Sequence, residues 1–340
     1  MIEPLAQSPN HLIRMSTYIV RRLLQGMVIL LIISFVSYGL TNLAGSPLSQ
    51  YTNNPHISQE DKARIARELG VDQSMPVQYL GWLKKVVMGD FGFSFTTKEP
   101  VVKIISARLP KTLILMFASE IVIVSISLVI GVLQAVRQYS AFDNIITGVS
   151  FVGYSMPIFF IALSLILIFA VGLKDLSRQP GWGWVPYLPT GTAVWDEKKV
   201  SEWVRNMILP IASLTIIQVA GYTRYVRSAM LEVLSQDYVR TARAKGLLEK
   251  AVVVRHALKN AALPFITVIG LDIPFLLGGA IVTEQVFSWA GMGRLFVEFA
   301  GKSDYPVIMG ILMLVATAVV FFSILTDLVY TLFDPRIRLN

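Results

Sequence analysis

The segment DYVRTARAKGLLEKAVVVRHALKNAALP, residues 237–264, decides how this chain is organised. It is basic and rich in helix-forming residues, and it lies between apolar runs that are long enough to cross a bilayer. Residues 238–245 predict a short helix, and Gly246 predicts its end, because glycine most readily adopts the left-handed conformation that closes a helix. We therefore expect a structured segment outside the membrane.

A second helix is predicted from residue 247 to about residue 261, directly after that break. Its apolar stripe comprises Leu248, Val252, Val253 and Leu258. Pro264 is expected to open the next apolar run from a first-turn position, where its missing N–H matters little. The alternative is a solvated loop made basic by membrane topology alone. We disfavour it because ordinary connections are short and lack helices.

The composition places the chain among multi-pass membrane proteins. Of its 340 residues, 54% are hydrophobic and only 15% are charged, with a mean hydropathy of +0.61. The formal net charge of +8 does not indicate nucleic-acid binding, because the basic residues cluster beside the apolar runs, as cytoplasmic flanks do. The absence of cysteine excludes disulfides and thiol chemistry. The first apolar run is expected to be a retained anchor rather than a cleaved signal.

The fold class predicted is an all-α polytopic membrane protein with six spans. The predicted spans are 23–43, 112–136, 145–173, 207–226, 263–284 and 305–332. Arg21 and Arg22 precede the first span, so residues 1–22 are expected in the cytoplasm, and Arg336 and Arg338 place the C-terminus there too. Residues 237–262 then form a cytoplasmic segment.

Two long segments are expected on the outer side. Residues 44–111 predict a small folded cap, and residues 174–206 a second loop. Within the cap, one helix is predicted between Ser58 and Gly70 and another over residues 76–89. The apolar face of the second helix is expected to pack on the cap rather than to lie on the membrane surface.

Three residues inside the predicted spans are candidates for the translocation path. Asp272 falls near the middle of its span, where a charge costs about 2.5–3.5 kcal/mol, so it must face protein or water. It either lines the path or is a buried structural residue. Glu120 either has a function or extends to the membrane interface. Pro157 is expected to kink its helix, for gating or for packing alone.

The 237–264 segment resembles the cytoplasmic signature of the permease subunits of ATP-binding-cassette importers. Ala242 and Gly246 keep the general pattern, and the form ARAKG…RHALKNAALP is similar to that of the dipeptide, oligopeptide and nickel branch. In that branch the loop docks on the ATPase. By this resemblance the ATPase-coupling residues are Ala242, Lys245, Gly246, Leu247, Arg255 and His256.

Other stretches resemble the same branch, and residues 107–340 resemble its permease core. The stretch SFVGYSMPIFF carries its Ser-x-Pro-x-Phe pattern around Pro157, and TDLVYTLFDPRIRL resembles its C-terminal end. The stretch TEQVFSWAGMGRLF resembles a further pattern from Glu284 to Arg294, with Ala290 where proline is usual.

The resemblance implies a permease of the cell inner membrane, in the bilayer, that imports peptides with several partners. These would be a second homologous permease, two cytoplasmic ATP-binding subunits and an extracytoplasmic solute-binding protein. ATP and Mg would be bound by the partner subunits, with no cofactor in this chain. A nickel chelate or an oligosaccharide is the alternative substrate.

The sequence itself lacks the motifs of an enzyme. It contains no phosphate-binding Gly-x-x-x-x-Gly-Lys-Ser/Thr loop, and His11, His56 and His256 are not at metal-ligand spacing. We therefore expect no enzyme, no metal site and no nucleic-acid partner. The alternative from another class is a proton-coupled secondary transporter that uses Asp272 and Glu120 as proton carriers.

Overall fold

The computed structural model describes residues 9–44, 73–191 and 200–333. These residues are helical and contain no strand, only a single bridge between Phe93 and Pro100. The predicted cap helix between Ser58 and Gly70 lies outside the described residues, as do both ends of the chain.

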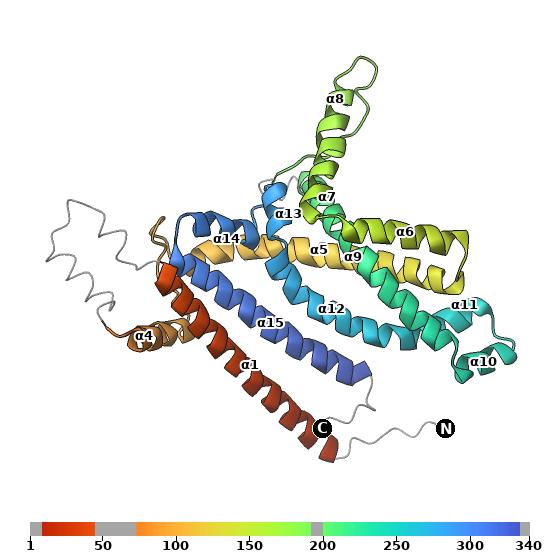
Figure 1. Ribbon diagram of the computed structural model, residues 1–340, viewed down its shortest axis with the longest axis horizontal. Helices are drawn as coiled ribbons and strands as arrows, with labels where there is room; N and C mark the ends of the chain where they lie inside the picture. The colour runs from red at the N-terminus through yellow and green to blue at the C-terminus, as the bar shows by residue number, and fades with distance from the viewer. Residues whose placement is uncertain (1–8, 45–72, 192–199, 334–340) are drawn as a thin grey trace. The chain divides into compact units, whose positions relative to one another are not determined.

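Figure 1 shows how the helices follow one another along the chain. In order they are α1 (Pro9–Ala44), α4 (Met75–Val87), α5 (Val101–Val136), α6 (Ala141–Ser155), α7 (Ile158–Leu165), the π-helix η1 (Ile166–Gly172), α8 (Leu173–Ser177), α9 (Val200–Leu234), α10 (Asp237–Ala244), α11 (Glu249–Ala251), the π-helix η3 (Val252–Leu258), α12 (Lys259–Gly279), α13 (Ile281–Val286), α14 (Met292–Gly301) and α15 (Tyr305–Phe333).

Five stretches of helix among the described residues are long and apolar enough to cross a membrane. They are Ile19–Leu43, Val101–Val136, Ile158–Ser177, Val200–Leu234 and Tyr305–Leu328. A sixth is present if Glu249–Ala262 and Pro264–Ile273, which are bent by 50°, count as one span. The all-helical polytopic class is confirmed, with five to six candidate spans.

The described residues fall into two compact units. The first comprises residues 9–44, 73–109 and 295–324, and the second comprises residues 110–191, 200–294 and 325–333.

In the first unit α4 packs against α1 through an aromatic cluster. The hydroxyls of Ser34 and Tyr79 are hydrogen-bonded at 2.8 Å, and the Tyr79 ring meets Phe35 edge-on at 5.3 Å. Val77 and Leu80, on the apolar face of α4, stay exposed. The predicted helix is confirmed, and the expectation that this face packs on the cap stays a prediction, because residues 45–72 of the cap lie outside the described residues. An exposed apolar face suits a helix that lies on the membrane surface.

The start of α15 is tied to the loop before α5 by a buried carboxylate. Asp304 accepts hydrogen bonds from the Ser94 hydroxyl at 2.7 Å and from the backbone N–H of Thr96 at 2.8 Å. Nearer the other end of α15, Val320 lies against Gly26 of α1, where a Cβ would collide with it. Small residues at such crossings let two helix backbones approach closely within a membrane.

In the second unit α9 is the central helix. It packs against α6, α7, α12 and α13, and its buried face carries large side chains such as Tyr222 and Met230. Phe265 of α12 meets the Tyr222 ring edge-on at 5.0 Å, and both belong to one core cluster with Ile123 of α5. The helices that pack on α9 thus supply the walls of the site described below.

Pro157 breaks its helix rather than bending it. α6 ends at Ser155, Met156 is extended at φ −81° and ψ 135°, and α7 begins after Pro157 in a new direction (Figure 1). The proline ring disfavours the helical conformation of the residue before it, which explains the extended Met156. The predicted kink is therefore wrong in degree: two separate helices replace one bent helix.

Candidate functional site

Glu120 is buried in the second unit and hydrogen-bonded to α9. Its side chain, on α5, is 6% exposed, and its Oε1 accepts a hydrogen bond of 3.2 Å from the Tyr222 hydroxyl. Its Oε2 has no hydrogen-bond partner among the described residues. The alternative that Glu120 extends to the membrane interface is therefore wrong, because the side chain is buried in the helix bundle.

Asp272 of α12 faces the same tyrosine. Its carboxylate interacts with the Tyr222 hydroxyl and lies close enough to Glu120 to interact with it electrostatically. Asp272 is half-buried and, with Tyr222, lines a cavity of about 850 Å³ between α6, α9 and α12. The two acidic residues singled out from the sequence are thus brought together by a residue that the sequence did not single out.

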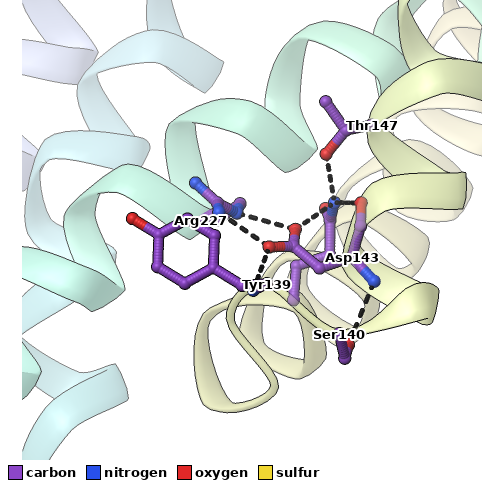
Figure 2. A network of polar contacts seen from close by, with 6 residues as sticks. Tyr139, Ser140, Asp143, Thr147 and Arg227 are labelled. Atoms are coloured by element: carbon purple, nitrogen blue, oxygen red, sulfur yellow. Dashed lines mark hydrogen bonds and ion pairs between the residues drawn. The ribbon is translucent and has the colours of Figure 1, made fainter.

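Asp143 and Arg227 form an ion pair beside this cavity. Asp143, at the start of α6, accepts hydrogen bonds from Arg227 Nε at 2.9 Å and Nη2 at 2.8 Å (Figure 2). The backbone N–H of Tyr139 and the side-chain amide of Gln134 donate to the same carboxylate. The Arg227 guanidinium holds the pKa of Asp143 below its ordinary value, although burial of the carboxylate opposes this shift. The pair fixes the hairpin of α5 and α6 to α9.

The break in the 237–264 segment has the predicted conformation. α10 ends at Ala244, and Gly246 has φ +76°, the left-handed conformation. Across this turn Arg243 donates two hydrogen bonds to the carboxylate of Glu249, at 3.1 Å from Nε and 2.7 Å from Nη2. The turn is therefore a closed structure with its own ion pair.

Some of the predicted coupling residues are buried within this segment, and others are exposed on its surface. Ala242 is buried with Val239 and Val252 in a small cluster that packs on the end of α9. Lys245, Gly246, Leu247 and Arg255 are exposed, and His256 is half-buried. Ala242 thus packs inside the chain, whereas most of the others are open to a partner.

The second predicted helix differs from the structure in three respects. It begins at Glu249 rather than at residue 247, and it contains the π-helix η3. Leu248, expected in the apolar stripe, is 81% exposed because it precedes the helix. Pro264 lies within α12 at the bend of 50°, where the apolar segment Pro264–Ile273 begins.

A fully buried carboxylate organises the turn after α13. Glu284 is 0% exposed; its Oε1 accepts from the Thr112 hydroxyl at 2.7 Å, and its Oε2 accepts from the backbone N–H of Arg294 at 3.0 Å. Thr112 Oγ1 in turn accepts from the backbone N–H of Met292. The buried Trp289 donates its indole N–H to the Lys111 carbonyl at 3.1 Å. The motif from Glu284 to Arg294 therefore has a structural role here.

Reasoning from the sequence missed Tyr222 and Asp143. Tyr222 looked like one aromatic residue among many in an apolar run, and nothing local marks its contact with Glu120. Asp143 had a local signal, because Ser140 accepts a hydrogen bond from the Asp143 backbone N–H in a helix cap.

The comparisons with known proteins agree over almost the whole chain. Residues 127–339 match the family described as "Binding-protein-dependent transport system inner membrane component", and residues 15–116 match its N-terminal partner family. The chain belongs to this family. It is a multi-pass protein of the cell inner membrane, and its family is one of transport components.

Several relatives in this family are similar along their full length. The chain is 43% identical to the oligopeptide transport system permease protein AppB of Bacillus subtilis, over 95% of the chain and 100% of that protein. It is 38% identical to the dipeptide transport system permease protein DppB of Escherichia coli K12, over 95% of the chain and 99% of that protein. The resemblance to a peptide branch of importer permeases is thus confirmed.

Proposed function

We propose that this chain is a permease subunit of an ATP-driven, binding-protein-dependent importer that carries peptides across the inner membrane. The observation that carries the proposal is similarity to permeases named for oligopeptides and dipeptides at 38–43% identity over 95% of the chain. A permease of this family needs a translocation path for its substrate and a mechanical link to its ATP-binding subunits. The cavity beside Asp272 suits the first task, and the segment at Gly246 suits the second.

The permease forms half of the translocation path, and a second homologous permease forms the other half. The cavity between α6, α9 and α12 supports this arrangement, because polar side chains in a membrane protein face a partner or water rather than lipid. An extracytoplasmic solute-binding protein delivers the substrate. Two cytoplasmic subunits bind ATP and Mg, and this chain supplies no catalytic residue and holds no cofactor.

The segment 237–262 couples the permease to those ATP-binding subunits from the cytoplasm. Leu247 and Leu248 are exposed apolar side chains at the tip of a turn that is flanked by exposed basic residues. Exposed apolar groups within a structured and otherwise polar segment are typical of a docking surface. Both termini lie in the cytoplasm in this topology, as the flanking arginines indicate.

Reconstitution tests the proposal. Proteoliposomes that contain this chain, its permease partner, the ATP-binding subunits and the binding protein should accumulate radiolabelled dipeptides and oligopeptides only when ATP is supplied. Accumulation of a nickel chelate or an oligosaccharide instead, with no peptide uptake, would refute the peptide assignment and leave the importer class intact.

A proton-coupled secondary transporter is the second candidate, and the proximity of two acidic side chains, Glu120 and Asp272, favours it. Such a transporter works alone. Peptide uptake by this chain without its partners, driven by a proton gradient in vesicles, would establish it and refute the ATP-driven importer.

A further inference from the structure

The cavity between α6, α9 and α12 carries charges of opposite sign. Its volume of about 850 Å³ is in the range of small-molecule binding sites. The polar side chains on its wall that matter here are Gln134, Tyr222, Arg224, Arg227 and Asp272.

The acidic and the basic side chains of the cavity lie on opposite flanks of α9. Tyr222 and Arg224 are two positions apart, which puts their side chains about 200° apart around a helix. Tyr222 faces Asp272 of α12, whereas the Arg224 guanidinium lies 5.2 Å from the ring centre of Phe151 of α6. The cavity thus runs across α9 from an anionic flank at α12 to a cationic flank at α6.

Arg224 is the available cation of this cavity. Arg227 is neutralised by Asp143, with which it forms two short hydrogen bonds. Arg224 is exposed to the cavity and, within the described part of the chain, has no acidic side chain at ion-pair distance. Its planar guanidinium can bind a carboxylate through two parallel hydrogen bonds.

Asp272 is the available anion, because the one donor that it meets is shared with a second carboxylate. A tyrosine hydroxyl has a single proton, and Tyr222 donates it to Glu120 at 3.2 Å. No basic side chain in the described ranges pairs with Asp272. A half-buried carboxylate that shares its single donor is incompletely hydrogen-bonded, and an ammonium group would supply up to three donors.

We propose that this cavity binds a passing peptide by its two termini, with the terminal ammonium at Asp272 and the terminal carboxylate at Arg224. This inference rests on the proposed function. The termini are the charged groups that all unblocked peptides share, and the wall between them carries apolar and aromatic side chains such as Tyr154, Val268 and Leu271, which tolerate varied side chains. Glu120 acts as a positioning residue, since it competes with Asp272 for the single proton of the Tyr222 hydroxyl.

The absence of cysteine permits a direct test of binding. Ser228 lies on the cavity wall and is exposed, so Ser228→Cys can be labelled with a small maleimide. The sample is the complete complex of permeases and ATP-binding subunits in nanodiscs, without the binding protein, and the probe is trialanine. Thr97→Cys, which is exposed outside this cavity, is the matched label control.

Trialanine should slow the labelling of Ser228→Cys and leave that of Thr97→Cys unchanged. N-acetyl-trialanine and trialanine amide should each protect at least about tenfold less well, because each lacks one charge-assisted hydrogen bond. Asp272→Asn should abolish the preference for the free amine, and Arg224→Gln that for the free carboxylate. Asp175→Asn and Arg178→Gln, at exposed positions outside the cavity, should change neither.

Two results would overturn the inference. One is the absence of protection by trialanine at any concentration, and the other is equal protection by the blocked peptides. ATP-driven uptake of peptides is measured on the same purified complex after reconstitution into proteoliposomes with the binding protein. Uptake without protection would reject this binding site alone, whereas failure of uptake would reject the proposed function.

Discussion

At the scale of single residues, Glu284 shows how a buried charge can serve structure. It has no exposed surface, and its two oxygens accept hydrogen bonds from the Thr112 side chain of α5 and the Arg294 backbone of α14. A buried carboxylate is tolerated when its oxygens find such donors. The glycine at position 291 is needed here because a Cβ would overlap the Glu284 carboxylate and the Thr112 hydroxyl.

Gly291→Ala should therefore destabilise the permease. The added methyl must displace the carboxylate or its donor, and overpacking of this kind costs about 1–3 kcal/mol. The measurement is thermal unfolding of the purified protein in detergent. Gly148→Ala, in α6, is the matched control, since no described atom lies within 4 Å of its Cβ position. An unchanged melting temperature for Gly291→Ala would show that the turn repacks freely.

Asp143→Asn should destabilise the protein at neutral pH. The variant leaves the partly buried Arg227 without its counter-charge, and breaking a buried ion pair costs about 3 kcal/mol. Asp175→Asn is the control, because its ion pair with Arg178 is exposed and should contribute less than about 1 kcal/mol. Equal melting temperatures for the two variants would contradict the prediction.

The same ion pair predicts how stability depends on pH. The folded-state pKa of Asp143 is below 3.8 because Arg227 donates to the carboxylate, so the folded state binds the proton less readily than the unfolded state. The contribution of the ion pair to stability is fully present above the unfolded-state pKa of Asp143 and is lost as the pH falls through its folded-state pKa. The difference in melting temperature between wild type and Asp143→Asn should be constant from neutral pH to about pH 5 and should shrink below pH 3.8. A difference that grows on acidification would contradict the assignment.

At the scale of elements, the turn between α10 and α11 is held from within. Val239, Ala242 and Val252 pack beneath it, the ion pair of Arg243 and Glu249 spans it, and Gly246 closes α10. Leu248 stays exposed beside this ordered turn. Such a segment can transmit a displacement as a rigid body, which is what coupling to an ATPase requires.

Gly246→Val should uncouple transport from ATP hydrolysis. A β-branched residue in the left-handed conformation costs about 1–2 kcal/mol, enough to shift the turn out of its conformation about tenfold. No described atom lies within 4 Å of the Cβ position, so the effect comes from the backbone alone. We expect the permease to be present in the membrane while ATP-driven transport is largely lost.

The matched variants for this position are Gly246→Asn and Gly246→Ala. Asparagine visits the left-handed conformation more readily than other residues with a side chain, so Gly246→Asn should retain most transport, and Gly246→Ala should lie between. Transport and ATPase activity are measured on the same proteoliposomes. Full transport by Gly246→Val would show that the segment is not the mechanical link.

At the scale of the whole molecule, the proposed topology can be mapped with single cysteines. The cysteine-free chain provides a clean background. Thr97→Cys and Lys250→Cys both lie at exposed positions. In intact cells a membrane-impermeant maleimide should label Thr97→Cys, and it should label Lys250→Cys only after the membrane is opened. Labelling of Lys250→Cys in intact cells would place the coupling segment outside the cell and contradict the proposed topology.

The sequence predicted the class of fold and the position at which a helix ends, at Gly246. Apolar runs of about 20 residues are a local property, as is the left-handed glycine at position 246, because each depends on a few neighbouring residues and on the solvent around them. Local rules were weaker at Pro157 and Leu248, where the structure has a full break and an exposed side chain. There the outcome depends on where a helix starts or stops, within one or two residues.

The tertiary structure alone decided which residues meet. Glu120 and Tyr222 are 102 positions apart, and Thr112 and Glu284 are 172 apart, so no periodicity in the chain could pair them. Hydropathy identified Asp272 as a residue that must avoid lipid, but only the packing of α12 on α9 supplies Tyr222 as its neighbour. The sequence by itself determined that several segments are long and apolar enough to cross a membrane, because transfer from water to lipid is a sum over local residues. Packing decided the partners of the buried charges, because each partner comes from a distant helix whose approach depends on the shapes of both surfaces.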